Sequence, residues 1–233
     1  MKIGILLTDD LREALKPQYG DYPEMFYRLL QAGNFNFTVY DVRAGEYPQA
    51  IDECAGYLIT GSRHGVYDDL PWLPPFFDFI RLLVAQKIPL LGVCFGHQAI
   101  AQALGGVVRK SSKGWGLGVH EWQMKQQAAW TTPELNSLRL LCVHQDQIEK
   151  LPPQATLLAG SEFCPYAAYA IDQHVFCIQG HPEFLSDYVI SILEYRKDDL
   201  SAETLAEIEK SCHESINRDT CAQWMENFFR LPR

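Results

Sequence analysis

The chain has 233 residues, of which 47% are hydrophobic and 21% charged, a composition typical of globular proteins. Its 20 Lys and Arg stand against 29 Asp and Glu, so the formal net charge is -9. This balance argues against nucleic acid or an anionic membrane surface as a partner, because both select clustered positive charge. The net charge does not argue against a small zwitterionic substrate.

The seven cysteines have no paired spacing, and no Cys and His cluster has the spacing of a metal site. Cys142 and Cys177 lie within apolar runs, where a free thiol usually behaves as a small buried hydrophobe. The apolar run at the N-terminus is too short for a signal peptide, and no window approaches the ~20 apolar residues of a membrane span. We therefore expect a cytoplasmic protein with reduced thiols, no metal and no cofactor.

The first half of the chain alternates short strand-like runs with helix-like segments. Strands are predicted at Lys2–Leu7, Phe37–Val42, Gly56–Thr60 and Pro89–Val93, and helices at Tyr22–Ala32, Trp72–Gln86 and Phe95–Leu104. This alternation predicts a parallel sheet with right-handed crossovers.

The second half is richer in strands and ends in helices. Strands are predicted at Val107–Arg109, Val119–Met124, Leu140–Val143, Ala155–Ala159, Ala168–Ile171 and Val175–Gln179, and helices at Leu185–Lys197, Ala202–Cys212 and Thr220–Arg230. No repeat, low-complexity tract or linker interrupts the chain. We therefore expect one domain over residues 1–233, of α/β class, with a mostly parallel sheet between helices, added antiparallel strands and a helical tail.

The most informative segment surrounds Cys94. An apolar strand runs directly into a helix, and Gly92 and Gly96 lie two positions to either side of Cys94. This pattern is typical of a nucleophile elbow, in which glycines permit a sharp strand-to-helix turn. The turn directs Cys94 to the carboxyl end of the sheet and to a helix N-terminus, which favours thiolate over thiol. The alternative is a buried cysteine between two packing glycines.

A second segment supplies an activating pair. The apolar run Val175–Gln179 leads to His181, Pro182 and Glu183. A cysteine nucleophile needs an imidazole to exchange its proton, and the imidazole needs a third group to fix its tautomer. Cys94, His181 and Glu183 therefore form a candidate catalytic triad at the ends of two strands.

These two ordered motifs, Gly-Val-Cys-Phe-Gly-His-Gln and Gly-His-Pro-Glu, resemble those of the class I glutamine amidotransferase family. The likeness is greatest to amidotransferase domains of the GMP-synthase type and to stand-alone plant γ-glutamyl peptidases, and it covers roughly residues 56–183. It implies a flavodoxin-like α/β fold and cysteine-dependent cleavage of a γ-glutamyl amide, without metal or organic cofactor.

The resemblance also implies roles for further residues. Gly61 occupies the position of a family glycine whose N–H helps form the oxyanion hole, and Phe95 supplies the second N–H. The residues implied to bind substrate are Gln98, Gln145, Asp146 and Ser62. His144 and Asp146 are equally consistent with loop-capping groups.

Two departures from the family pattern affect the choice of substrate. The segment from Gly114 through Trp115 to Gly118 lacks an acidic residue that relatives carry there. Arg63 and His64 replace the end of a glycine-rich or proline-containing loop, and they either face the pocket mouth or lie solvated on the loop. After the first strand, Asp9, Asp10 and Arg12 either border the site or cap a helix, and we expect the helix cap.

Three functions remain open. The first is a glutaminase that releases ammonia from glutamine for a separate synthetase subunit. The second is a stand-alone hydrolase of γ-glutamyl peptides or amines. The third is a non-catalytic binding or regulatory subunit, against which the intact Cys94, His181 and Glu183 count.

Overall fold

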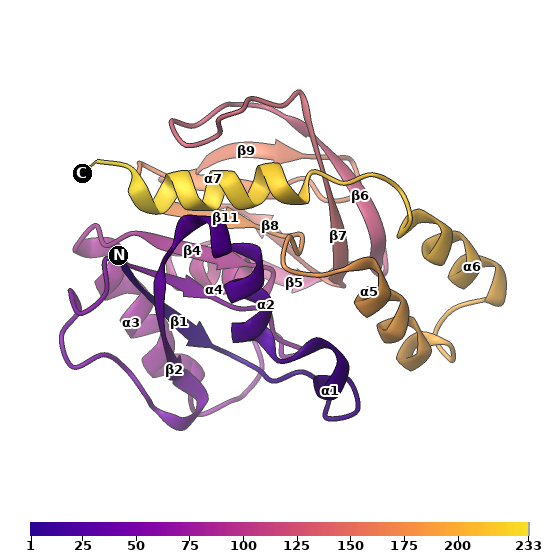
Figure 1. The fold of residues 1–233 in the computed structure, drawn as a ribbon, viewed down its shortest axis with the longest axis horizontal. Coiled ribbons are helices and arrows are strands. Elements are labelled where there is room, and N and C mark those ends of the chain that lie inside the picture. Colours follow the sequence, from indigo (N-terminus) through magenta and orange to yellow (C-terminus); the bar gives the residue numbers. More distant parts are fainter. Residues whose placement is uncertain (233) are drawn as a thin grey trace.

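The computed structural model describes residues 1–232, which fold around a nine-stranded sheet (Figure 1). In spatial order the strands are β2 (Asn36–Asp41), β1 (Lys2–Leu7), β3 (Gly56–Ile59), β4 (Leu90–Val93), β11 (Val175–Ile178), β10 (Ala168–Ile171), β9 (Thr156–Gly160), β6 (Gly116–Met124) and β7 (Ser137–His144). A separate two-stranded antiparallel sheet joins β5 (Val107–Lys110) to β8 (Asp146–Lys150).

The first five strands of this order are mutually parallel, and the remaining four are antiparallel additions. The parallel part follows the flavodoxin-like order 2-1-3-4-5, with β11 in the fifth place. The predicted fold class, a mostly parallel α/β sheet with added antiparallel strands and C-terminal helices, is confirmed.

Helices cover both faces of the sheet. They are α1 (Lys16–Tyr19), α2 (Tyr22–Leu29), α3 (Leu73–Ala85), α4 (Phe95–Ala103), α5 (Ser186–Leu193), α6 (Ala202–Ser211) and α7 (Arg218–Arg230), with short 3-10 turns η1 (Gln31–Gly33), η2 (Val42–Ala44) and η3 (Glu194–Arg196). In Figure 1, α2 and α7 lie in front of the sheet, and α3 and α4 lie behind it.

Alternating strand residues divide the core between these two faces. In β11, Phe176 packs with residues of α2 and α7, whereas its neighbour Cys177 packs with residues of α3 and α4. In β3, Leu58 likewise belongs to the core on the side of α2 and α7, and Tyr57 to the core on the side of α3 and α4. The near-continuous burial of these strands follows from coverage on both faces.

Several boundaries differ from those predicted. Strand β8 and the single-turn helix α1 were not predicted, because neither carries an apolar period. Strands β6 and β7 are longer than expected, because pairing continues from Gly116 opposite His144 to Gln123 opposite Ser137. The first tail helix ends as α5 at Leu193, after which the backbone tightens into η3.

The last helix docks on the front of the sheet. Trp224, Phe228 and Phe229 are all buried, as their spacing predicts. The ring centroid of Phe228 lies 5.1 Å from that of Trp130 and 5.9 Å from that of Phe176. The residues of α7 therefore complete this core. Within residues 1–232, no helix is long and apolar enough to cross a membrane.

We expect Phe228→Ala to lower the free energy of unfolding by about 3–5 kcal/mol, because it leaves a cavity in a closely packed aromatic cluster. Urea denaturation followed by circular dichroism measures the change. Gln223→Ala, at an exposed position of the same helix, is the matched control and should stay within about 0.5 kcal/mol of wild type. Equal losses in the two variants would contradict the packing assigned to α7.

Candidate functional site

Cys94 lies at the junction between strand β4 and helix α4. Its backbone has φ 52° and ψ -101°, a conformation that a residue with a side chain rarely adopts. Such a conformation costs of order 1–3 kcal/mol and persists only where the surrounding packing holds it. The strained turn agrees with the predicted elbow. The side chain is only 5% exposed and faces a cavity.

The two flanking glycines allow the close packing that holds this turn. A Cβ atom on Gly92 would lie 2.6 Å from the backbone carbonyl group of Gly96. A Cβ on Gly96 would lie 2.7 Å from the carbonyl oxygen of Ile59 in β3. Both positions therefore require glycine, and the alternative of simple packing around a buried thiol does not account for the strained backbone between them.

His181 and Glu183 form a buried pair beyond the end of β11. His181 Nδ1 lies 2.7 Å from Glu183 Oε1, and both side chains are at most 3% exposed. The imidazole also stacks on Phe184, with ring centroids 3.9 Å apart and planes inclined by 3°. The carboxylate keeps a proton on Nδ1 and Phe184 fixes the plane of the ring, so these two contacts together set the direction of Nε2.

The electrostatic surroundings favour a protonated imidazole. Burial acts to lower the pKa of His181, but the charges of Cys94 and Glu183 and their hydrogen bonds outweigh burial and raise the pKa to about 10. At neutral pH the ring is therefore an imidazolium, with Cys94 on one side and Glu183 on the other. Such a group can stabilise a thiolate and then donate a proton.

A buried glutamine that the sequence analysis did not single out contacts the sulfur. The Nε2 of Gln179 donates to Cys94 Sγ at 3.5 Å, and its Oε1 accepts from Gln98 Nε2 at 3.0 Å. Gln98 Nε2 also donates to the carbonyl of Asp146 at 2.9 Å. Because a carbonyl only accepts, this bond fixes the orientation of Gln98 and thereby directs the amide N–H of Gln179 at the sulfur.

The two N–H groups expected to form the oxyanion hole come from different strand ends. Phe95 is the first residue of α4, so its N–H has no acceptor within the helix. The hydroxyl of Thr8 donates to the carbonyls of Thr60 and Gly61 at 3.2 and 3.0 Å, which holds the peptides on both sides of Gly61. A Cβ on Gly61 would lie 2.9 Å from His181 Cε1, so a side chain there would displace the imidazole.

A cavity of about 360 Å³ opens over Cys94 and His181. All four predicted substrate-binding residues line it: Gln98, Gln145, Asp146 and Ser62. The volume lies within the range of about 300–1,000 Å³ found for ligand pockets. Within residues 1–232, no group of three or more His, Cys, Asp or Glu side chains is arranged to hold a metal ion.

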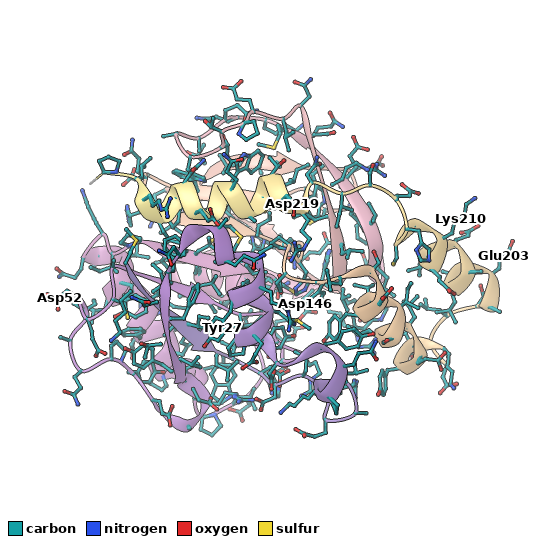
Figure 2. All side chains as sticks on the ribbon, in the orientation of Figure 1. Tyr27, Asp52, Asp146, Glu203, Lys210 and Asp219 are labelled. Atoms are coloured by element: carbon teal, nitrogen blue, oxygen red, sulfur yellow. The ribbon has the colours of Figure 1, made fainter. Side chains whose placement is uncertain are left out.

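The wall formed by β7 and β8 carries polar groups whose orientation is fixed. Asp146 accepts a hydrogen bond from Tyr67 Oη at 2.8 Å; burial is the main cause that raises the pKa of this carboxyl. In Figure 2, Asp146 lies near the middle of the molecule, whereas Glu203 and Lys210 lie on α6 at its periphery. His144 also lines the cavity, and burial lowers its pKa to about 3, so the ring is neutral.

The loop after β3 is braced from β1. Asp9 accepts from Arg63 N, Nε and Nη2 at 2.8, 2.9 and 2.9 Å. The expectation that Asp9, Asp10 and Arg12 cap a helix was wrong, because the cap of α2 is Asp21 and α1 has no side-chain cap. Asp10 and Arg12 instead line the cavity. Ser62 accepts from the N–H of His64 at 3.1 Å, and both residues line the cavity. Arg63 thus has a fixed carboxylate partner at the pocket mouth.

Comparisons with known proteins agree with this geometry. Residues 19–188 match the family model for glutamine amidotransferase class-I. The chain is 31% identical over 201 residues to γ-glutamyl peptidase 3 of Arabidopsis thaliana, covering 83% of this chain and 81% of the relative. It is 35% identical over 131 residues to a GMP synthase [glutamine-hydrolyzing] of Dehalococcoides mccartyi, covering 55% of this chain and 23% of that protein.

Among solved structures, a glutamine amidotransferase from Thermotoga maritima superposes with a TM-score of 0.74 at 20% sequence identity, covering 97% of this chain and 95% of that chain. At this identity the likeness concerns the fold. It extends over the antiparallel strands and the C-terminal helices as well as the parallel part of the sheet.

We expect Gln179→Met to slow alkylation of Cys94 by iodoacetamide about tenfold near neutral pH. The variant keeps the side-chain length but loses an N–H donor to the thiolate, and a hydrogen bond to a charged group is worth about 1.5–3 kcal/mol. Mass spectrometry of the Cys94 peptide measures the rate. At high pH, where the thiol is ionised in both proteins, the rates should converge; a pH-independent difference would mean that Gln179 acts only through packing.

Proposed function

Because this chain belongs to the class I glutamine amidotransferase family, we propose that it hydrolyses γ-glutamyl amide bonds through a glutamyl thioester on Cys94. The observation that carries this proposal is the strained turn that presents Cys94 to a cavity beside the buried His181 and Glu183 pair. A cysteine, a protonated imidazole and an orienting carboxylate are the groups that acyl transfer to sulfur requires.

In the first half of the reaction, the Cys94 thiolate attacks the side-chain carbonyl carbon of the glutamyl group. The N–H groups of Gly61 and Phe95 stabilise the oxyanion that forms. His181 then donates its proton to the departing nitrogen as the carbon–nitrogen bond breaks, so ammonia or an amine leaves and the thioester remains. Glu183 accepts a hydrogen bond from the N–H at Nδ1, so the proton that is transferred is the one on Nε2.

In the second half, His181 is neutral and takes a proton from water as the water oxygen attacks the thioester carbon. Collapse of the second oxyanion expels the thiolate and releases the glutamyl carboxylic acid, which loses its proton to solvent. The thiolate and imidazolium are then restored. The Oε1 of Gln98 is the acceptor left to this side chain, because both contacts of its amide nitrogen are made within the protein. It suits the α-ammonium group of the substrate.

We favour a stand-alone hydrolase of γ-glutamyl peptides or amines. The similarity to a γ-glutamyl peptidase extends over most of both chains, and the cavity continues well beyond Cys94. The second candidate is a glutaminase that passes ammonia to a separate synthetase, which the likeness to part of a GMP synthase supports. We further propose that residues 1–233 act as one domain in the cytoplasm, where reducing conditions keep all seven buried thiols free.

We expect Cys94→Ser to reduce glutamate release from both glutamine and a γ-glutamyl dipeptide by at least about a thousandfold, because a serine hydroxyl is not ionised here. A coupled glutamate dehydrogenase assay measures the release. Cys54→Ala, which removes a buried thiol outside the cavity, should retain activity. If wild type releases no glutamate from either compound, with or without cell extract to supply a synthetase, the proposed function is wrong.

We expect kcat/KM to decline as pH rises through about 10, since the imidazolium of His181 is lost there. The pKa of His181 is raised in the folded state, so its contribution to stability is complete below about 6.5 and is also lost as pH rises through about 10. Glu183→Gln removes one cause of the raised pKa and should move the alkaline limb toward neutral pH.

Full pH profiles of kcat/KM measure this shift. Glu203→Gln, which removes an exposed carboxylate on α6 (Figure 2), is the control for the loss of one negative charge. An unchanged alkaline limb in Glu183→Gln would show that Glu183 does not set the protonation of His181.

A further inference from the structure

The cavity extends past His181 along one side of the chain that follows β11. Phe184, stacked on the imidazole, contacts Tyr188 edge-to-face with ring centroids 4.5 Å apart. Tyr188, Ile192 and Tyr195 follow at helical spacing, and all line the cavity. A continuous strip of aromatic and apolar side chains therefore leads from the proton donor toward the outside.

Two stacked pairs close the outer end of this strip. The guanidinium carbon of Arg12, in the loop after β1, lies 4.2 Å from the ring centroid of Tyr195. The guanidinium carbon of Arg196 lies 3.9 Å from the ring centroid of Trp115, in the loop before β6. Because Tyr195 and Arg196 are consecutive, the η3 turn is held to two separate walls of the cavity.

The carboxylates that line the cavity already have partners. Asp10 accepts from Arg43 Nη1, Asp68 from the N–H of Gly65 and Asp146 from Tyr67 Oη, each at 2.8 Å.

The outer cations are less neutralised. Across residues 1–232, no carboxylate lies within ion-pair distance of Arg12, which instead contacts the ring of Tyr195. Among the same residues, Asp199 is the one carboxylate within ion-pair distance of Arg196, with its Oδ2 3.4 Å from Arg196 Nη1. In a chain with a net charge of -9, this end of the cavity is thus cationic.

We propose that Tyr188, Ile192, Tyr195, Arg12, Arg196 and Trp115 form a leaving-group subsite for an amino acid or short peptide with an apolar side chain and a free carboxylate. This proposal rests on the proposed function and specifies its substrate class.

His181 must protonate the departing nitrogen, so whatever is attached to that nitrogen lies on the imidazole side of Cys94, where the strip begins. The apolar strip accommodates the side chain of the leaving group. The outer guanidinium groups bind its carboxylate through charge-assisted hydrogen bonds.

Three matched compounds test the subsite: glutamine, γ-glutamyl-leucine and γ-glutamyl-leucinamide, in which an amide replaces the terminal carboxylate. Glutamate release gives kcat/KM for each. We expect γ-glutamyl-leucine to exceed both other compounds by at least about tenfold, the factor that one charge-assisted hydrogen bond supplies. Equal kcat/KM for γ-glutamyl-leucine and its amide would overturn the subsite.

Variants then assign the preference to named residues. Arg12→Gln and Arg196→Gln should each reduce the ratio of kcat/KM for γ-glutamyl-leucine over γ-glutamyl-leucinamide, and Arg12→Lys should retain more of that ratio than Arg12→Gln. Arg81→Gln removes an arginine on α3, outside the cavity, and should leave both activity and ratio unchanged. A ratio that survives in both glutamine variants would refute the role of the two arginines.

The outcomes separate this proposal from the one on which it rests. If glutamate release from glutamine depends on Cys94 but kcat/KM for γ-glutamyl-leucine does not exceed that for γ-glutamyl-leucinamide, the hydrolase is supported and the leaving-group subsite is refuted. If no compound yields glutamate in a Cys94-dependent reaction, the proposed function fails and the subsite fails with it.

Discussion

The turn from strand β4 into helix α4 holds Cys94 at φ 52°, and the packing around it must outweigh roughly 1–3 kcal/mol of backbone strain. The absence of side chains at Gly92 and Gly96 brings α4 against β4 and β3, which keeps the strained residue in place. The same close approach sets the first N–H of α4 beside the sulfur. In the proposed mechanism, a single backbone constraint thus sets both the position of the attacking sulfur and that of one N–H group for the oxyanion.

The sulfur and the imidazole come from adjacent parallel strands, β4 and β11, whose register pairs Val93 with Ile178. Both strands end at the same edge of the sheet, which is why Cys94 and His181, distant in sequence, lie close together. From that edge, Gln179 and Phe184 act on opposite partners: one donates to the sulfur, and the other fixes the plane of the imidazole. The proposed catalytic pair, Cys94 and His181, thus has a buried supporting group on each side.

The sequence predicted the parts of this site that depend on local chain chemistry. The turn at Cys94 is marked by two nearby glycines, and the pair His181 and Glu183 by the proline between them. Both motifs span only a few residues, so both could be recognised in the sequence. Gln179 and the pairing of Asp9 with Arg63 were not predicted, because each depends on neighbours that only the sheet brings together. Strand β8 escaped prediction for the same reason: its polar sequence pairs only because β5 lies alongside.

Helix α7 follows every strand of the sheet in the chain, yet it packs on the front of strands that are made much earlier. Phe229 packs where any side chain on Gly56 would clash, and Trp224 donates to the carbonyl of Pro133. On the ribosome, the apolar surface that α7 covers on the front of the nascent sheet therefore stays exposed until this helix emerges. Folding of the front layer has to finish after synthesis of the last strand, and this interval is when the chain most needs protection from self-association.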